Sequence, residues 1–286
     1  MLNQVDPTFE FVRQLSQELS RSDFDLPPFP DTALRVQSAL RDPDIDIRKL
    51  GAIVLSEPAL AARLLRMSNS AVMRRGSMEV TDINTAIARI GLTMVQNVAV
   101  SFAARAAFKA PRGSIVQEYL ESTRLHSFRV AALAYMLGRK VQFVGKADEA
   151  MLAGLLHTVG KFYILTRADA FPEVFADEHA LQGLMDQWHT GIGRAIVESW
   201  GFPENVAQAV DEYEMTERDY SQPADITDVV LVANLVARAS LEEPPNWALL
   251  EGLPSLVRLK LDIESLQALV QASQGEVDSM VEAMTG

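Results

Sequence analysis

Apolar residues recur along nearly the whole chain at intervals of three and four, and no segment alternates apolar and polar residues as a half-buried strand would. The pattern therefore predicts an all-α protein. Between residues 31 and 40 the apolar positions fall mainly on one face, after a rigid PPFP turn that holds the chain extended. Asp46 is placed to cap the next helix, and Pro58 to open a third helix that continues to Met67.

A helix, a short turn and a second helix are expected in the stretch that follows. Thr81 or Asp82 caps the segment INTAIARI, and Gly91 is a left-handed stop. A second helix then runs from Thr93 toward Phe108. This geometry is also that of a DNA-reading helix-turn-helix. The second segment, however, is apolar around much of its circumference and has few side chains suited to base edges, which favours core packing.

The break KAPRGS at residues 109–114 carries Pro and Gly between two helical stretches, and we expect two packed helical subdomains to meet there. This interpretation divides the chain into an N-terminal helix (residues 1–23), an N-terminal subdomain (24–112) and a C-terminal subdomain (113–286). Beyond the break the pattern predicts helices over Tyr119–Gly138, Glu149–Leu165, Trp188–Pro203, Glu204–Tyr213, Asp225–Leu241 and Asp262–Met284.

The composition is that of a folded globular protein. Hydrophobic residues make up 48% of the 286 residues and charged residues 22%, which argues against long intrinsic disorder. The sequence has no cysteine, which excludes disulfides, thiolate metal sites and cysteine nucleophiles. The N-terminal stretch lacks the basic start and apolar core of a signal peptide, and no stretch is long and apolar enough to span a bilayer. We therefore expect a cytoplasmic protein without membrane association.

A net charge of −12 repels a phosphate backbone at long range and argues against general nucleic-acid binding. The most cationic surface candidate is a stretch with four arginines and a single acid: Arg63, Arg66, Arg74, Arg75 and Glu79. This stretch is either a solvated face with ordinary ion pairs or a site that binds an anion.

Three of the four histidines, His126, His157 and His189, lie on different predicted helices among apolar neighbours. A histidine in such a place is more often a hydrogen-bonded core group than a ligand. His157 stands in the segment LLHTVGK, where adjacent His and Asp would offer a metal ion one imidazole nitrogen and one anionic oxygen. Thr158 offers only a hydroxyl. The fourth histidine, His179, lies in an acidic stretch that indicates a loop or a helix end.

Several motifs occur in order along the chain: LPPFP, then SEPALAARLLRMSNSA, then AIARIGL and finally LLHTVGK. With these motifs the chain resembles the HDOD family, a relative of the HD-domain phosphohydrolases that is found in bacterial signalling proteins. The resemblance spans roughly residues 24–240. It implies a multi-helix bundle, in which an N-terminal HDOD subdomain packs on a C-terminal degenerate HD core. It also implies bacterial signal output rather than metabolism.

The resemblance places the ligand positions of HD enzymes on this chain residue by residue. His126 matches the first histidine, His157 the histidine of the His-Asp doublet, and His189 a later histidine. Members of the family with more of these ligand residues have a further histidine. Its position falls in the segment AVDEYE, which contains no histidine.

Both acidic positions of the pattern are missing, since Thr158 replaces the aspartate of the doublet and the closing aspartate falls at Asn234. A metal hydrolase needs carboxylates to offset the charge of its cation. The resemblance therefore implies a vestigial centre without catalytic residues, metal or other cofactor. The alternative is a single zinc ion held by His126, His157 and His189 with one open position.

Arg129 and Lys161 lie near these histidines in the sequence. They would neutralise a phosphate if an anionic ligand occupied the vestigial pocket, and otherwise they are solvated cations. The chain has no P-loop, no G-x-S-x-G motif and no dinucleotide fingerprint, so kinase, serine hydrolase and dehydrogenase functions have no support.

Three functions stay open. The first is a non-catalytic signalling module that contacts other proteins or senses a ligand; its partners would be signalling proteins such as a receiver, a sensor kinase or a cyclic-dinucleotide enzyme. The second is a metal-dependent phosphohydrolase that acts on a phosphorylated or cyclic nucleotide. The third is a regulator that reads DNA through the helix pair of residues 83–108 and the arginines of residues 63–75.

Overall fold

The computed structural model describes residues 9–14, 17, 31–42, 44–74, 78–108, 115–168, 170–176, 178–218 and 222–285. Every named element in these ranges is a helix, and the one β-type pairing found there is a single parallel bridge between Val144 and Asp225. The prediction of an all-α fold is therefore confirmed.

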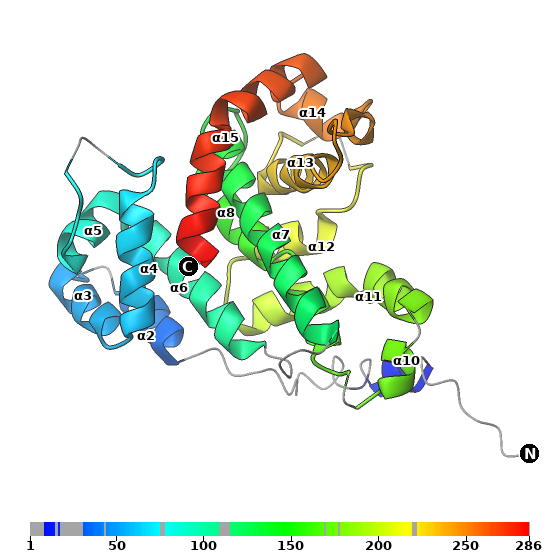
Figure 1. Cartoon of the computed structure of the whole chain (residues 1–286), viewed down its shortest axis with the longest axis horizontal. Coiled ribbons are helices and arrows are strands. Elements are labelled where there is room, and N and C mark those ends of the chain that lie inside the picture. Colours follow the sequence, from blue (N-terminus) through cyan, green and yellow to red (C-terminus); the bar gives the residue numbers. More distant parts are fainter. Residues whose placement is uncertain are drawn as a thin grey trace, which may run out of the picture.

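The N-terminal helices form a group at the left of Figure 1. They are α2 (Asp31–Leu40), α3 (Ile47–Leu55), α4 (Pro58–Asn69), α5 (Ile83–Ile90) and α6 (Leu92–Ala107). Asp46 caps α3, because its carboxylate accepts a hydrogen bond of 2.9 Å from the backbone N–H of Arg48. Asp82 caps α5 in the same way, with a bond of 2.9 Å from the N–H of Thr85. Both helices thus begin where the sequence predicted.

The chain bends by 109° between α5 and α6 at Gly91, whose φ of +84° would strain any residue with a side chain. Beyond the bend, α6 buries Val95, Val98 and Ala103 and lies against α2, α4 and α8. The helix is therefore a core element, as its apolar circumference predicted. Among the described helices no single one is long and apolar enough to cross a membrane, and the α5–α6 pair meets that test only when both helices are joined.

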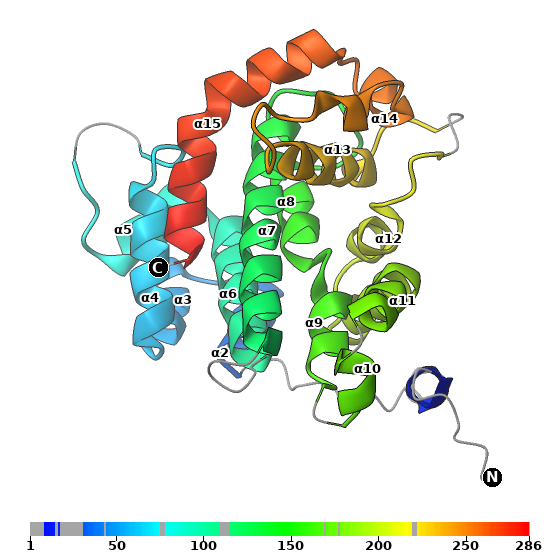
Figure 2. The same ribbon diagram turned by 45° about the vertical axis from the view of Figure 1, so that its right-hand side comes forward.

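The later helices build the rest of the molecule around α7 (Figure 2). They are α7 (Ile115–Gly138), α8 (Ala147–Leu156), α9 (Val159–Leu165), α10 (Pro172–Ala176), α11 (Glu178–Ser199), α12 (Glu204–Glu212), α13 (Ile226–Ala239), the 3-10 helix η1 (Trp247–Leu250), α14 (Pro254–Arg258) and α15 (Ile263–Thr285). α7 contacts α8, α13 and α15. α15 also reaches α4, so its C-terminal end lies beside the N-terminal helices (Figure 1).

The single helix predicted over residues 149–165 is wrong, because α8 ends at Leu156 and α9 begins at Val159. The break lies at His157 and Thr158, and contacts with other elements produce it. The side chain of Thr158 is hydrogen-bonded to Ser127 of α7. On the other side α9 approaches the backbone of α11 so closely that a Cβ atom at residue 160 would lie 1.9 Å from a carbonyl oxygen. The apolar pattern runs through the break and does not reveal it.

The predicted start of α11 at Trp188 is also wrong, since the helix begins at Glu178. The preceding turns are amphipathic, with Leu181, Leu184 and Met185 buried at the helical spacing of three and four. This early part of α11 carries the helix past α10 and positions its middle against α9 and α12.

Candidate functional site

The rings of three histidines and one tyrosine lie next to one another inside the molecule. His126 comes from the middle of α7, His157 directly follows α8, and His189 lies on α11. The ring centroids of His126 and His157 are 5.5 Å apart. Tyr213, directly after α12, has its ring centroid 4.7 Å from that of His157 and 5.8 Å from that of His189. The fold thus gathers the three histidines of the vestigial pattern, with a tyrosine ring between the second and the third.

The outer two histidines are held by specific hydrogen bonds. Nε2 of His126 lies 2.8 Å from Oδ1 of Asn234, and because an amide oxygen only accepts, this nitrogen donates. Nδ1 of His189 donates to the backbone oxygen of Met185, and its Nε2 is hydrogen-bonded to the hydroxyl of Tyr213 at 2.7 Å. Each of these bonds occupies the Nε2 nitrogen of its ring.

His157 is the exception among the three. Its Nδ1 donates to the backbone oxygen of Gly154 at 2.7 Å, while its buried Nε2 has no partner among the described residues. Burial lowers the pKa of this ring well below the ordinary value of 6.5, and burial also lowers the pKa of His126. Both imidazoles are therefore neutral at pH 7.

The residues present do not fit a metal ion of the kind that HD enzymes hold. Thr158 is hydrogen-bonded to Ser127, and Asn234 is hydrogen-bonded to His126. Both side chains are neutral, so neither supplies the anionic oxygen that offsets the charge of a divalent cation. Within the described ranges no three His, Asp or Glu side chains converge as metal ligands.

One carboxylate approaches this centre from the segment after α12. Oε1 of Glu214 lies 3.5 Å from Nε2 of His189 and 3.8 Å from Nζ of Lys161. Burial alone would raise the pKa of Glu214, but the neighbouring His189 and Lys161 outweigh burial and lower this pKa to about 2. Tyr213 and Glu214 both lie in the AVDEYE segment, where Tyr213 is one of the residues that stand in place of the histidine expected from the family pattern, and the sequence assigned neither of them a role.

A pocket of about 390 Å³ lies beside His126, between α7, α9 and α13. It brings together Arg129 and Lys161, the two cations that the sequence proposed as anion ligands, with His126 and Thr158. The remaining lining residues are small, hydroxylic or aliphatic: Ser122, Thr123, Leu125, Ala237 and Leu241. The last two come from α13 and the segment just after it, which the sequence did not connect with the histidines.

The predicted cationic surface of residues 63–75 is wrong for Arg63, which is buried with its guanidinium carbon 5.6 Å from the ring centroid of Phe102. Position 63 lies on the inward stripe of α4, between the buried Leu60 and Met67. Arg66 and Arg74 are exposed. Arg66 borders a separate hollow of about 510 Å³ between α4, the segment before α5, and α15. Arg75 lies outside the described residues.

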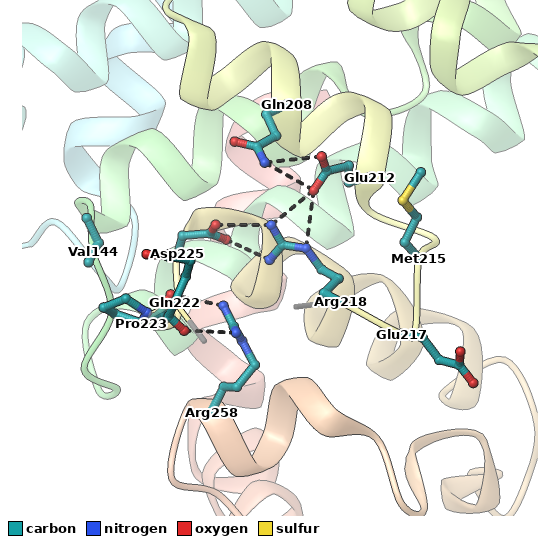
Figure 3. Close-up of a pocket in the computed structure, with 10 residues that line it drawn as sticks. All are labelled: Val144, Gln208, Glu212, Met215, Glu217, Arg218, Gln222, Pro223, Asp225 and Arg258. Atoms are coloured by element: carbon teal, nitrogen blue, oxygen red, sulfur yellow. Dashed lines mark hydrogen bonds and ion pairs between the residues drawn. The ribbon is translucent and has the colours of Figure 1, made fainter. Parts of the chain in front are cut away.

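A larger hollow of about 550 Å³ contains two further arginines (Figure 3). Arg218 forms ion pairs with Asp225 at 2.9 Å and Glu212 at 3.0 Å. Arg258 pairs at 2.9 Å with Asp228, a fully buried carboxylate. These cations hold the segment before α13 against the end of α12 and α14. Their charges are matched within the protein, which is the arrangement of a structural ion-pair network.

A model of the HDOD domain matches residues 26–215, which is most of the chain. The chain belongs to the HDOD family. Its helices therefore belong to a known fold.

Among proteins with which this HDOD chain was compared, one from Treponema pallidum is 26% identical over 275 residues. The match covers 89% of the chain but 50% of that protein, so the chain spans about half the length of this relative. A candidate metal-dependent phosphohydrolase from Shewanella amazonensis SB2B has a similar structure, with a TM-score of 0.77 and 25% identity over 98% of this chain and all of that one. A candidate signal transduction protein from Marinobacter aquaeolei VT8 gives a TM-score of 0.63 and 22% identity, covering 99% and 67% of the two chains.

Proposed function

We propose that this HDOD protein is a non-catalytic module of bacterial signal transduction. The observation that carries the proposal is the hydrogen-bonding of the vestigial centre. Nε2 of His126 is committed to Asn234 and Nε2 of His189 to Tyr213, so of these three Nε2 atoms only that of His157 has no partner among the described residues. One neutral imidazole nitrogen without a carboxylate does not hold or activate a divalent cation.

The neutral residues at the two acidic positions support the same conclusion. In an active centre the side chains of residues 158 and 234 would be carboxylates, and burying them without a metal ion would cost free energy. Here Thr158 is satisfied by Ser127, and Asn234 by His126. Both positions are therefore satisfied by hydrogen bonds within the protein, and neither offers an anionic oxygen to a cation.

A module of this kind acts through what it binds. The partner that we propose is a separate or linked signalling protein, such as a receiver, a sensor kinase or an enzyme of cyclic-dinucleotide metabolism. The description of the similar Marinobacter aquaeolei protein as a candidate signal transduction protein supports this direction. The description of the Shewanella amazonensis protein as a candidate phosphohydrolase makes hydrolysis the alternative to test.

The test combines metal analysis with an activity assay. Protein purified without chelator is analysed for bound metals, and hydrolysis of bis-p-nitrophenyl phosphate is measured with added Zn²⁺, Mn²⁺, Fe²⁺ and Mg²⁺. We expect metal far below one equivalent per chain and the same background hydrolysis in the wild type, His157→Ala and His126→Ala. Stoichiometric metal, with turnover that both substitutions abolish while the fold is kept, would overturn the proposal.

A further inference from the structure

One pocket collects positive charge in a chain whose net charge is −12. The 390 Å³ pocket between α7, α9 and α13 is lined by Arg129 and Lys161, and no carboxylate is among its described lining residues. Arg238 lies on α13 near the same pocket, close enough that its charge adds to burial in lowering the pKa of Lys161. A concave site that is lined by cations, with no carboxylate among them, attracts anions.

Arg129 is available to a ligand. Within the ranges that the structure describes, its guanidinium takes part in no hydrogen bond or ion pair. The arginines of the larger hollow differ, because Arg218 is held by Asp225 (Figure 3) and Arg258 is held by Asp228. A half-buried guanidinium without a carboxylate is the form of arginine that binds an incoming phosphate or carboxylate with two parallel hydrogen bonds.

Lys161 supplies the second cation. Its nearest described carboxylate, on Glu214, lies 3.8 Å from Nζ, which is beyond hydrogen-bonding distance. The lysine side chain is 24% exposed, so it keeps access to the pocket while Glu214 holds it in place. Asp186 is the other acid that acts on Lys161, and it is exposed.

The pocket also has an apolar lining. Leu125 of α7 and Leu241 after α13 are 52% and 73% exposed, although both line the pocket. Exposed leucines of this kind gain free energy when a ligand covers them, at about 25 cal/mol for each Å² of apolar surface removed from water. Together with Ala237 they give the pocket apolar lining residues that suit a flat or aliphatic group.

We infer that this pocket binds an organic phosphate, with the phosphate between Arg129 and Lys161 and an apolar body against Leu125, Ala237 and Leu241. The volume lies within the range of roughly 300–1,000 Å³ that is usual for small-molecule sites. A pocket of this size suits a ligand whose apolar part consists of one or two rings. The inference extends the proposed function, because it gives the signalling module a ligand to sense. It rests on the proposed function in one respect, which is that the protein binds the phosphate without hydrolysing it.

The experiment uses 1-naphthyl phosphate as a probe, titrated into the full chain by isothermal calorimetry. Inorganic phosphate, 1-naphthol and 1-naphthoate are titrated in parallel. We expect 1-naphthyl phosphate to bind more tightly than inorganic phosphate and 1-naphthol. Inorganic phosphate lacks the apolar rings, and 1-naphthol lacks the phosphate. Binding of 1-naphthoate that equals or exceeds binding of the phosphate would overturn the assignment of a phosphate and identify a carboxylate site.

Two pairs of variants test the two halves of the pocket. Arg129→Ala is expected to weaken binding about tenfold or more, the usual effect of losing a bidentate charged hydrogen bond, while Arg66→Ala, at an exposed arginine elsewhere, leaves Kd unchanged. Leu241→Ser is expected to weaken binding of 1-naphthyl phosphate but not of inorganic phosphate. Its matched control is Val257→Ser, at a side chain that is 75% exposed on α14.

The result that overturns the inference is distinct from the result that overturns the proposed function. No binding of 1-naphthyl phosphate at millimolar concentration, or equal effects of Arg129→Ala and Arg66→Ala, removes the ligand site and leaves the non-catalytic function untouched. Release of inorganic phosphate from the bound probe, abolished by His157→Ala, removes the non-catalytic function and leaves the binding site in place.

Discussion

The hydroxyl of Tyr213 lies 2.7 Å from Nε2 of His189, at the nitrogen that a third imidazole ligand would offer to a metal ion. The ring of Tyr213 also lies edge-on against His157, at 4.7 Å between centroids and an interplanar angle of 82°. One side chain thus separates His157 from His189 and satisfies the second of them. The zinc site considered from the sequence would require Tyr213 to move out of a position where it is only 1% exposed.

Replacing Tyr213 by Phe is expected to lower the free energy of unfolding by about 1–3 kcal/mol, because the buried Nε2 of His189 then loses its 2.7 Å hydrogen bond. Urea unfolding of the wild type and of Tyr213→Phe measures this loss. The double variant with His189→Leu provides the control. Since removing both polar partners relieves the unsatisfied group, the double variant should cost less than the sum of the two single substitutions. Additive effects would mean that the two side chains do not depend on each other.

Stability should fall in two stages as the solution is acidified. The pKa of His157 is lowered by burial, so its neutral ring stabilises the fold above pH 6.5, and this contribution is lost as the pH falls below that value. The pKa of Glu214 is lowered from 4.5 to about 2, so its contribution is present above pH 4.5 and is lost between pH 4.5 and 2.

Urea unfolding at a series of pH values separates the two stages. One buried histidine that stays neutral in the folded state makes the free energy of unfolding fall by up to about 1.4 kcal/mol per pH unit below pH 6.5. His157→Gln is expected to reduce the slope of this part of the curve, to which His126 also contributes, and to leave the decline below pH 4.5. His179→Gln, at a histidine outside the vestigial centre, serves as the control and should preserve both stages. An unchanged slope in His157→Gln would contradict the assignment.

Much of the fold follows from periodicity, and the exceptions share a cause. Asp46 and Asp82 cap their helices through contacts with residues two and three positions away, which a linear sequence contains. The break at His157 and Thr158 depends on Ser127 and on the backbone of α11, which lie far away in the sequence. No local pattern encodes such a contact. Arg63 is different, since its place on the apolar stripe of α4 could have been seen.

The candidate site shows the same division. The family pattern identified His126, His157 and His189, because their positions follow from the order of motifs. It did not show that Tyr213 stands between two of them, since this depends on how α12 approaches α8 and α11. It also could not show that Leu241 faces the same pocket as Arg129. Side chains from separate helices meet only in the folded chain.

Restoring the acidic residue of the doublet should make the fold respond to metal ions. Thr158 is 1% exposed, so Thr158→Asp buries a carboxylate beside His157 and His126 and should destabilise the metal-free protein by at least about 2 kcal/mol. Zn²⁺ or Mn²⁺ offsets this charge, and the Tm of Thr158→Asp should rise on adding either ion. Thr158→Val is the control, since it also loses the bond to Ser127 but offers no charge. An equal metal response in both variants would place the ion elsewhere.

The closeness of α9 to α11 can be tested at one glycine. A Cβ atom built on Gly160 would lie 1.9 Å from the carbonyl oxygen of His189 and 2.8 Å from the backbone nitrogen of Gly193. Since both neighbours are backbone atoms of a long helix, neither can rotate away, and Gly160→Ala must push the two helices apart. We expect a loss of about 3 kcal/mol or more in the free energy of unfolding, comparable to the larger costs of overpacking.

The matched control for Gly160→Ala lies on the same pair of helices. A methyl group added at Gly191 of α11 would have no atom within 4 Å, so Gly191→Ala meets no obstacle and should stabilise the helix by about 0.5–1 kcal/mol. Opposite signs for the two substitutions in urea unfolding would follow only if α9 touches the backbone of α11 at residue 160. His189 supplies the carbonyl oxygen that a Cβ atom at residue 160 would meet, so Gly160→Ala should also disturb the hydrogen bond between His189 and Tyr213. In the double variant, Tyr213→Phe should therefore cost less free energy of unfolding than it does alone. Full additivity of these two substitutions would separate the helix contact from the histidine centre.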